Sequence, residues 1–134
     1  MKKFLNYLTA ATVAVAGLSV ATASPALAAV GGCSPSSNPT VVVCVNHGAD
    51  GAKTRGDFYL NRTPDWSTYR YSEHFVVNGR EEASSRGGSL TVTGRYCCTY
   101  TTRVRGTRIA NRVKIYTQSG VVHVQMDSPT ITVP

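Results

Sequence analysis

The residues with the most distinctive chemistry in this chain are its four cysteines, Cys33, Cys44, Cys97 and Cys98. In an exported protein an even number of cysteines is typical of a disulfide framework, and here it predicts two bonds. A bond between the neighbours Cys97 and Cys98 is disfavoured, because their Cα atoms are closer than disulfides usually require. Two pairings between residues 33–44 and residues 97–98 remain. Because Cys44 lies in an apolar run, our best prediction pairs it with Cys98, the buried half of its strand, and pairs Cys33 with Cys97, the outer half. Zinc would favour CxxC pairs or nearby histidines, so we expect no metal.

Other groups with catalytic potential are sparse. Three histidines are present, namely His47, His74 and His123. None belongs to an HExxH motif, and GxSxG, GxGxxG and GxxxxGK[ST] motifs are all missing from the sequence. Adjacent carboxylates occur only at Glu81 and Glu82, in a polar stretch that indicates a solvated loop rather than a general acid and base. We expect a protein that is not an enzyme and that uses no cofactor.

The first 28 residues have the pattern of a secretory signal peptide. A basic start at residues 1–3 precedes an apolar run that extends to Val20, and Ala26-Leu27-Ala28 supplies a small-x-small cleavage site. Polar residues interrupt the apolar run, which is also short for a membrane span. We expect cleavage after Ala28, a secreted, extracellular protein and no membrane anchor.

The remaining 106 residues carry an uneven positive charge. The whole chain has 14 Lys and Arg against 7 Asp and Glu, and loss of Lys2 and Lys3 leaves a net charge of +5. Residues 83–126 contain seven basic residues and no acidic one. This pattern indicates either a solvated basic sheet face or a docking surface for an acidic partner, because arginine favours bidentate contacts to anions.

Hydrophobic alternation predicts strands through most of the chain after residue 39. The expected strands cover residues 40–46, 57–62, 67–77, 90–93, 95–105, 109–117 and 121–126, with a further edge strand at 130–133. Asn78-Gly79 is a strong signal for a tight turn. Because no window shows a helical period, we predict an all-β domain over 40–134, a small antiparallel sandwich or barrel of about seven or eight short strands. Residues 29–39 are rich in Gly, Ser and Pro and predict a flexible arm.

A rigid sheet protein without catalytic motifs commonly works through its loops and aromatic side chains. We expect the polar stretch at 80–89 to form a long loop that presents arginine to a partner. The candidate partner-binding residues are Trp66, Arg80, Glu81, Glu82, Arg86, Arg103 and Arg105. The expected partner is another secreted protein with a trypsin-like cleft or an acidic surface, and not a nucleic acid.

Three functions fit these features. The first is a non-catalytic interaction subunit of an extracellular assembly. The second is a protease inhibitor that presents an arginine-containing loop. The third is a cationic antimicrobial or envelope-binding protein, whose binding should weaken as ionic strength rises.

The combination of a signal peptide, 106 further residues, four cysteines with the adjacent pair Cys97-Cys98, and an all-β pattern resembles a known family. It is similar to the small secreted adaptor subunits of bacterial umbrella-type toxin particles. The resemblance implies an adaptor that links a toxin-bearing stalk to lectin-bearing subunits, whose degenerate trypsin-like clefts receive an adaptor segment. Residues 80–89 or 29–39 would then be that segment, and the protein would take part in antagonism between bacteria.

Overall fold

The computed structural model describes residues 30–35, 40–49, 51–62 and 68–134. Within these ranges the chain forms nine strands in two antiparallel sheets. Sheet A has the order β1-β2-β3-β6 and comprises β1 (Val30–Cys33), β2 (Val41–His47), β3 (Lys53–Leu60) and β6 (Gly94–Thr102). Sheet B has the order β5-β4-β7-β8, and β9 also pairs with β7. Its strands are β4 (Arg70–Val77), β5 (Arg80–Ser89), β7 (Arg108–Tyr116), β8 (Val122–Asp127) and β9 (Ile131–Thr132).

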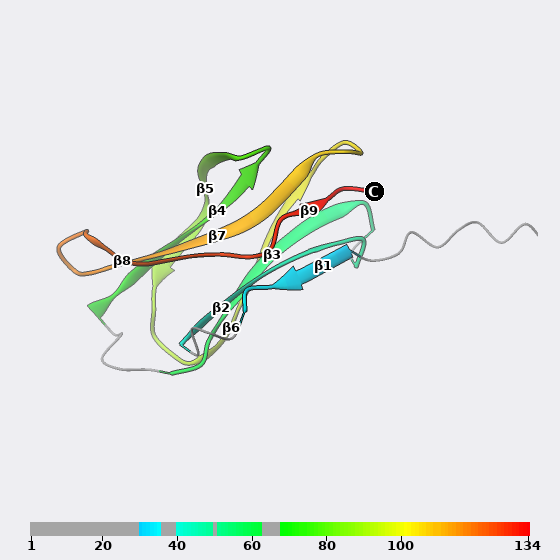
Figure 1. Ribbon diagram of the computed structural model, residues 1–134. Coiled ribbons are helices and arrows are strands. Elements are labelled where there is room, and N and C mark those ends of the chain that lie inside the picture. The colour runs from blue at the N-terminus through cyan, green and yellow to red at the C-terminus, as the bar shows by residue number, and fades with distance from the viewer. Residues whose placement is uncertain (1–29, 36–39, 50, 63–67) are drawn as a thin grey trace, which may run out of the picture.

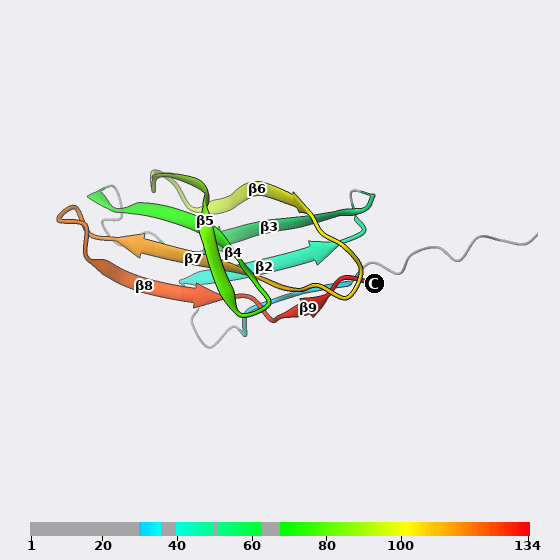
Figure 2. The same cartoon turned by 90° about the horizontal axis from the view of Figure 1, so that it is seen from above.

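The two sheets pack face to face as a β-sandwich. Figure 1 shows the strands of sheet B above those of sheet A, and Figure 2 shows most strands running along the same long direction of the molecule. The predicted all-β antiparallel fold is therefore confirmed. Of the two predicted architectures it is the sandwich, because the strands divide into two separate sheets.

Alternation along each strand fills the space between the sheets. In the Val-rich strand β2, Val41, Val43 and Val45 point inward and are buried. The main cluster consists of Val41, Val43, Phe58, Leu60, Leu90, Val113 and Ile115. The Phe58 ring stacks on Tyr96 with 4.7 Å between centroids, so this aromatic pair belongs to the core.

A polar bridge crosses this core. The Asn111 side chain on β7 is fully buried, and its Nδ2 donates to Glu73 Oε1 at 2.7 Å and to the Cys44 carbonyl oxygen at 3.1 Å. Since Cys44 lies in sheet A, Asn111 joins the two sheets. Gly56 makes room for it, because a Cβ there would lie 2.7 Å from the Asn111 side chain. Burial raises the pKa of Glu73, while the hydrogen bond from Asn111 and the charge of Arg86 oppose that rise.

Three segments differ from the prediction. Residues 90–93, predicted as a strand, instead connect β5 to β6, because the Tyr96 hydroxyl hydrogen-bonds the backbone of Thr91 and Val92. Residues 30–33 form β1 rather than part of a flexible arm, and residues 80–89 form the edge strand β5 rather than a loop. The cause of the strand at 80–89 is the turn at Asn78 and Gly79, which have φ of 51° and 81°. This turn places Arg80 directly opposite Val77, so the next residues pair with β4 despite their weak strand propensity.

Three predictions concern residues outside the described ranges: the signal peptide at 1–28, residues 29 and 36–39 of the arm, and Trp66. Among the described residues, no helix has the length and apolar character needed to cross a bilayer.

Candidate functional site

The connection between β6 and β7, residues 103–107, projects from one end of the sandwich, and we call it the Arg105 turn. Figure 1 shows it beside the C-terminus. Val104 is 79% exposed, and Arg105 is also exposed. The Val104 carbonyl oxygen accepts hydrogen bonds from Thr107 N at 3.2 Å and from Thr107 Oγ1 at 2.7 Å. Gly106 has φ of 85°, so the chain makes a β-turn with Arg105 at its tip.

Hydrogen bonds and an ion pair hold this turn on both sides. Gly106 N donates to the Val133 carbonyl oxygen at 2.8 Å, and Val133 N donates to the Thr107 carbonyl oxygen at 2.8 Å. Val133 is itself buried, so the C-terminal segment connects the turn to the core. On the other side, the Arg103 guanidinium forms an ion pair with Glu82 of β5. The turn is fixed before any partner binds, which lowers the entropy cost of binding.

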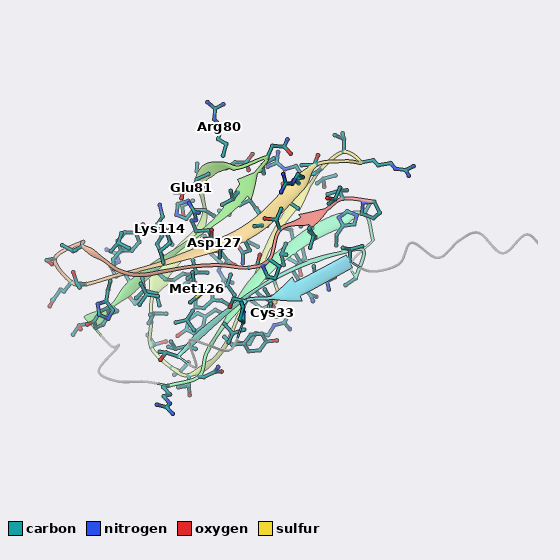
Figure 3. The ribbon with its side chains drawn as sticks, in the orientation of Figure 1. Cys33, Arg80, Glu81, Lys114, Met126 and Asp127 are labelled. Atoms are coloured by element: carbon teal, nitrogen blue, oxygen red, sulfur yellow. A yellow bond between two sulfur atoms is a disulfide. The ribbon has the colours of Figure 1, made fainter. Side chains whose placement is uncertain are left out.

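The two arginines predicted at residues 80–89 have different environments. Arg80 is exposed at the start of β5, and Figure 3 shows its side chain extending away from the molecule. Arg86 is half-buried, with its Nε 3.3 Å from Glu73 Oε2 and its guanidinium 5.5 Å from the centroid of the Tyr71 ring. The expectation of an exposed loop arginine at 86 is wrong, because strand alternation directs this side chain toward the core.

Glu81 belongs to a charge cluster with Arg112, Lys114 and Asp127 on the outer face of sheet B. Glu81 accepts hydrogen bonds from Lys114 Nζ at 2.6 Å and from Arg112 Nη1 at 2.9 Å, and these bonds lower its pKa to about 2. Arg112 also donates to both carboxylate oxygens of Asp127, at 2.7 Å each, and its pKa is raised. Figure 3 shows Glu81, Lys114 and Asp127 on this side of the molecule. These charges neutralise one another and brace the sheet.

A hydroxyl and imidazole pair lies beside the charge cluster, and the sequence analysis missed it. Ser72 Oγ is 2.7 Å from His74 Nε2 and 3.0 Å from the Tyr116 hydroxyl. His74 Nδ1 is 3.0 Å from the Glu82 carbonyl oxygen and 3.6 Å from Glu81 Oε1. The spacing of two residues on one strand was the signal, because it places Ser72 and His74 on the same face. The hydroxyl and imidazole are arranged as in acyl transfer, but the hydrogen bond of Nδ1 is to a backbone carbonyl and not to the Glu81 carboxylate.

Both disulfides lie on the outer face of sheet A, and their pairing differs from the prediction. The bonds are Cys33–Cys44 and Cys97–Cys98. Cys33 lies directly opposite Cys44 in the β1–β2 ladder, whereas Asp57 of β3 separates Cys44 from Cys97. Two strand spacings are about 10 Å, which is beyond the Cα separation that a disulfide spans. The predicted pairs Cys44–Cys98 and Cys33–Cys97 are therefore wrong.

Asp57 and Arg95 lie between the two disulfides. Asp57 is 3% exposed, and its Oδ2 accepts from Arg95 Nε at 2.6 Å. This bond raises the pKa of Arg95, whose Nη2 also donates to Cys98 Sγ at 3.7 Å. The ligand atoms of Asp57, Cys97 and Cys98 lie within 4.8 Å of one another. Because the two sulfur atoms are bonded to each other, they lack the thiolate charge that a metal ion requires.

A cavity of about 250 Å³ opens on the same face. It is lined by both sulfur residues of the first disulfide and by polar side chains of β2, β3 and β6, namely Asn46, Arg55, Asp57, Tyr59 and Arg95. A second cavity, of about 430 Å³, lies on sheet B beside Ser72 and Tyr116.

Comparisons of the chain with protein-family models, with curated proteins and with solved structures find no match.

Proposed function

We propose that this protein is a small secreted, non-catalytic binding subunit, an adaptor of an extracellular antibacterial toxin assembly. The observation that carries the proposal is the Arg105 turn, which presents Val104 and Arg105 on a backbone fixed by hydrogen bonds from both flanks. An exposed apolar side chain next to an exposed arginine on a rigid turn is typical of a recognition element.

The chemistry of the turn defines the partner. Arg105 favours a carboxylate at the base of a cleft, since a guanidinium binds a carboxylate through two parallel hydrogen bonds. Val104 favours an apolar wall beside that carboxylate. A trypsin-like cleft, whether active or degenerate, offers both features. Five of the seven basic residues at 83–126 form ion pairs with carboxylates, so recognition depends on Arg105 itself rather than on a broad positive field.

The Arg105 turn replaces the segment first expected to enter the partner. Residues 80–89 form the strand β5, which pairs with β4 with two irregularities in register, and Arg86 contacts the core. Two of the predicted partner-binding residues, Arg103 and Arg105, belong to the turn. Arg103 supports the turn through Glu82, and Arg105 makes the contact.

Purification from culture supernatant tests this proposal. A tagged full-length chain is expressed in the organism that encodes it, and the co-purified secreted proteins are quantified by mass spectrometry. We expect one stoichiometric partner with the wild type and with the matched control Arg80→Ala, and about tenfold less of it with Arg105→Ala. Absence of any stoichiometric partner, or equal recovery with Arg105→Ala, would overturn the proposal.

Protease inhibition is a second candidate, favoured by the same fixed turn. An inhibitor would block an active trypsin-like protease at equimolar concentration and would resist cleavage after Arg105. An adaptor for a degenerate cleft would leave the protease active. Measuring residual protease activity together with the integrity of the chain distinguishes these two functions.

The non-catalytic character is tested at Ser72. The Ser72 hydroxyl is bonded to both His74 and Tyr116, and the His74 ring is buried and bonded to β5, which favours a structural role. We expect no labelling of the protein by a fluorophosphonate probe and no turnover of a p-nitrophenyl ester. Labelling that disappears in Ser72→Ala would establish acyl transfer instead.

A further inference from the structure

We infer that the adjacent disulfide Cys97–Cys98 is a site of thiol exchange. An accessible thiolate attacks Cys97 Sγ, and the Arg95 guanidinium stabilises the Cys98 thiolate that leaves. The inference is independent of the Arg105 turn, which lies in a different part of the molecule.

The two cysteines differ in solvent exposure. Cys97 is exposed on the outer face of sheet A, and Cys98 is half-buried. An incoming thiolate must approach the sulfur that it attacks in line with the bond that breaks, so access to one sulfur selects the point of attack. Cys97 is the sulfur that solvent reaches more readily.

Electrostatics favour the same direction. Arg95 Nη2 lies 3.7 Å from Cys98 Sγ, and Asp57 orients the guanidinium from the other side. A cation close to a sulfur stabilises its thiolate and makes it a better leaving group. The charged residues of the adjoining strand β3 are Asp57, the register partner of Cys97, together with Arg55 and Lys53. The Asp57 carboxylate lies within 4.8 Å of both sulfur atoms, so it is the contact with Arg95 that places the negative charge on Cys98.

The exchange balances without an external oxidant. The attacking sulfur forms a bond to Cys97 Sγ, the Cys97–Cys98 bond breaks, and its electron pair stays on Cys98 Sγ. One disulfide is consumed and one is formed. The product is a mixed disulfide that tethers the thiol-bearing molecule to Cys97, and attack by Cys98 on that bond releases it again.

The Cys33–Cys44 disulfide lacks this combination of an exposed sulfur and a leaving sulfur beside a cation. Cys44 is 7% exposed, and its bond to Cys33 joins paired strands of sheet A. Attack at Cys33 would leave a thiolate on the buried Cys44, where loss of hydration disfavours the charge. The inference therefore predicts a difference in reactivity between two disulfides on the same face.

Trapping with reduced glutathione tests the site directly. The full chain is incubated with glutathione at neutral pH, exposed thiols are alkylated with iodoacetamide, and fragmentation between residues 97 and 98 locates each adduct. We expect glutathione on Cys97 and the alkyl group on Cys98, with Cys33–Cys44 intact. A parallel arm with a short single-cysteine peptide shows whether a polypeptide thiol also adds there. Adducts on Cys98, prior reaction of Cys33–Cys44, or two free thiols in the untreated protein would overturn the inference.

Variants of Arg95 test the role of the guanidinium. We expect Arg95→Gln to slow adduct formation about tenfold, the size typical of a hydrogen bond to a charged group, and Arg95→Lys to slow it less. Arg108→Gln, which removes an exposed arginine of sheet B, is the matched control. An unchanged rate in a folded Arg95→Gln protein contradicts the inference.

Single-cysteine variants provide a readout that does not alter Arg95. Iodoacetamide should alkylate Cys98 in Cys97→Ser faster at neutral pH than Cys97 in Cys98→Ser, although Cys97 is the more exposed residue. The opposite order would overturn the assignment of Cys98 as the leaving group.

Discussion

The outer faces of the two sheets are braced by different chemistry. Sheet A carries two disulfides with the Asp57–Arg95 ion pair between them. Sheet B carries the charge cluster of Glu81, Arg112, Lys114 and Asp127, which is held by ion pairs and their hydrogen bonds, without a covalent link. Thiols cleave disulfides, which salt hardly affects, whereas salt and changes of pH weaken ion pairs. The interactions on the two outer faces can therefore be weakened separately, with thiols for sheet A and with salt or acid for sheet B.

The core between the faces couples them. Asn111 extends from sheet B to the backbone of sheet A and also hydrogen-bonds Glu73, which is fully buried. If this bridge is lost, each face loses its support from the other. The largest loss of stability is therefore expected from a substitution at Asn111, the core residue that links sheet A to sheet B.

Asn111→Ala should have that largest effect. It removes several buried hydrogen bonds and leaves Glu73 Oε1 without its donor, so we expect a loss of about 4 kcal/mol in the free energy of unfolding. Urea denaturation measures this loss. The exposed Asn61→Ala serves as control and should change the free energy by less than about 0.5 kcal/mol. A loss of that smaller size at Asn111 would show that the two sheets are not coupled through this side chain.

Removing each disulfide of sheet A in turn should show that one stabilises the fold and that the other does not. Cys33 and Cys44 are 11 residues apart, so Cys33→Ser with Cys44→Ser should cost about 3 kcal/mol by chain entropy. The Cys97–Cys98 bond closes almost no loop, so the double variant Cys97→Ser with Cys98→Ser should lose about 1 kcal/mol or less in the free energy of unfolding. Thermal unfolding of the two proteins, compared with the wild type, measures the difference. Equal losses would contradict the distinction between a structural and an exchangeable disulfide.

Arg112→Gln should weaken sheet B in a salt-dependent way. Arg112 bonds to both Glu81 and Asp127 and is mostly buried, so we expect a loss of about 2 kcal/mol at low salt. The loss should shrink at about 1 M salt, where screening weakens the wild-type cluster. The disulfide variants provide the contrast, since their losses should not change with salt. A loss in Arg112→Gln that is independent of salt would mean that the arginine acts through packing alone.

The smallest of these effects is expected from Glu81, whose contribution to stability should be lost in acid. The pKa of Glu81 is lowered to about 2 in the folded protein, so its contribution is complete above the ordinary value of 4.5 and is lost as pH falls toward 2. Because the side chain is 27% exposed, we expect about 1 kcal/mol after solvent screening. Unfolding of the wild type and Glu81→Gln between these pH values measures the difference.

Glu73 acts in the opposite direction during this titration. Its pKa is raised by burial, so protonation as pH falls favours the folded state. This contribution is present in both proteins and cancels when Glu81→Gln is compared with the wild type. If the two proteins lose stability in parallel between pH 4.5 and 2, Glu81 does not contribute in the way that its hydrogen bonds indicate.

The sequence predicts the fold class well because the strand signals are local. The Val-rich run of β2, the alternating segment of β4 and the Asn78-Gly79 turn depend on neighbouring residues, and each appears in the structure. The strand at 80–89 was not predictable from its own composition. Its Ser and Gly residues have weak strand propensity, and only the tight turn before it makes pairing with β4 unavoidable.

The candidate site depends on contacts between distant segments, which the sequence does not display. Cys33 pairs with Cys44 because β1 lies on β2, and β1 comes from a segment whose Gly-rich composition indicates no strand. The importance of Arg105 follows from hydrogen bonds between its turn and Val133, almost thirty residues away in the chain. The sequence identified Arg103 and Arg105 as candidates but not the turn that distinguishes them from Arg80.

The most direct test of the proposed adaptor function is the affinity of the co-purified partner for three versions of this protein. Calorimetry at about 0.1 M salt compares the wild type, Arg105→Ala and Arg80→Ala. We expect Arg105→Ala to weaken binding about tenfold or more and Arg80→Ala to change it less than about twofold. Equal weakening by both variants would indicate a diffuse positive field, and unchanged affinity in Arg105→Ala would contradict docking through the turn.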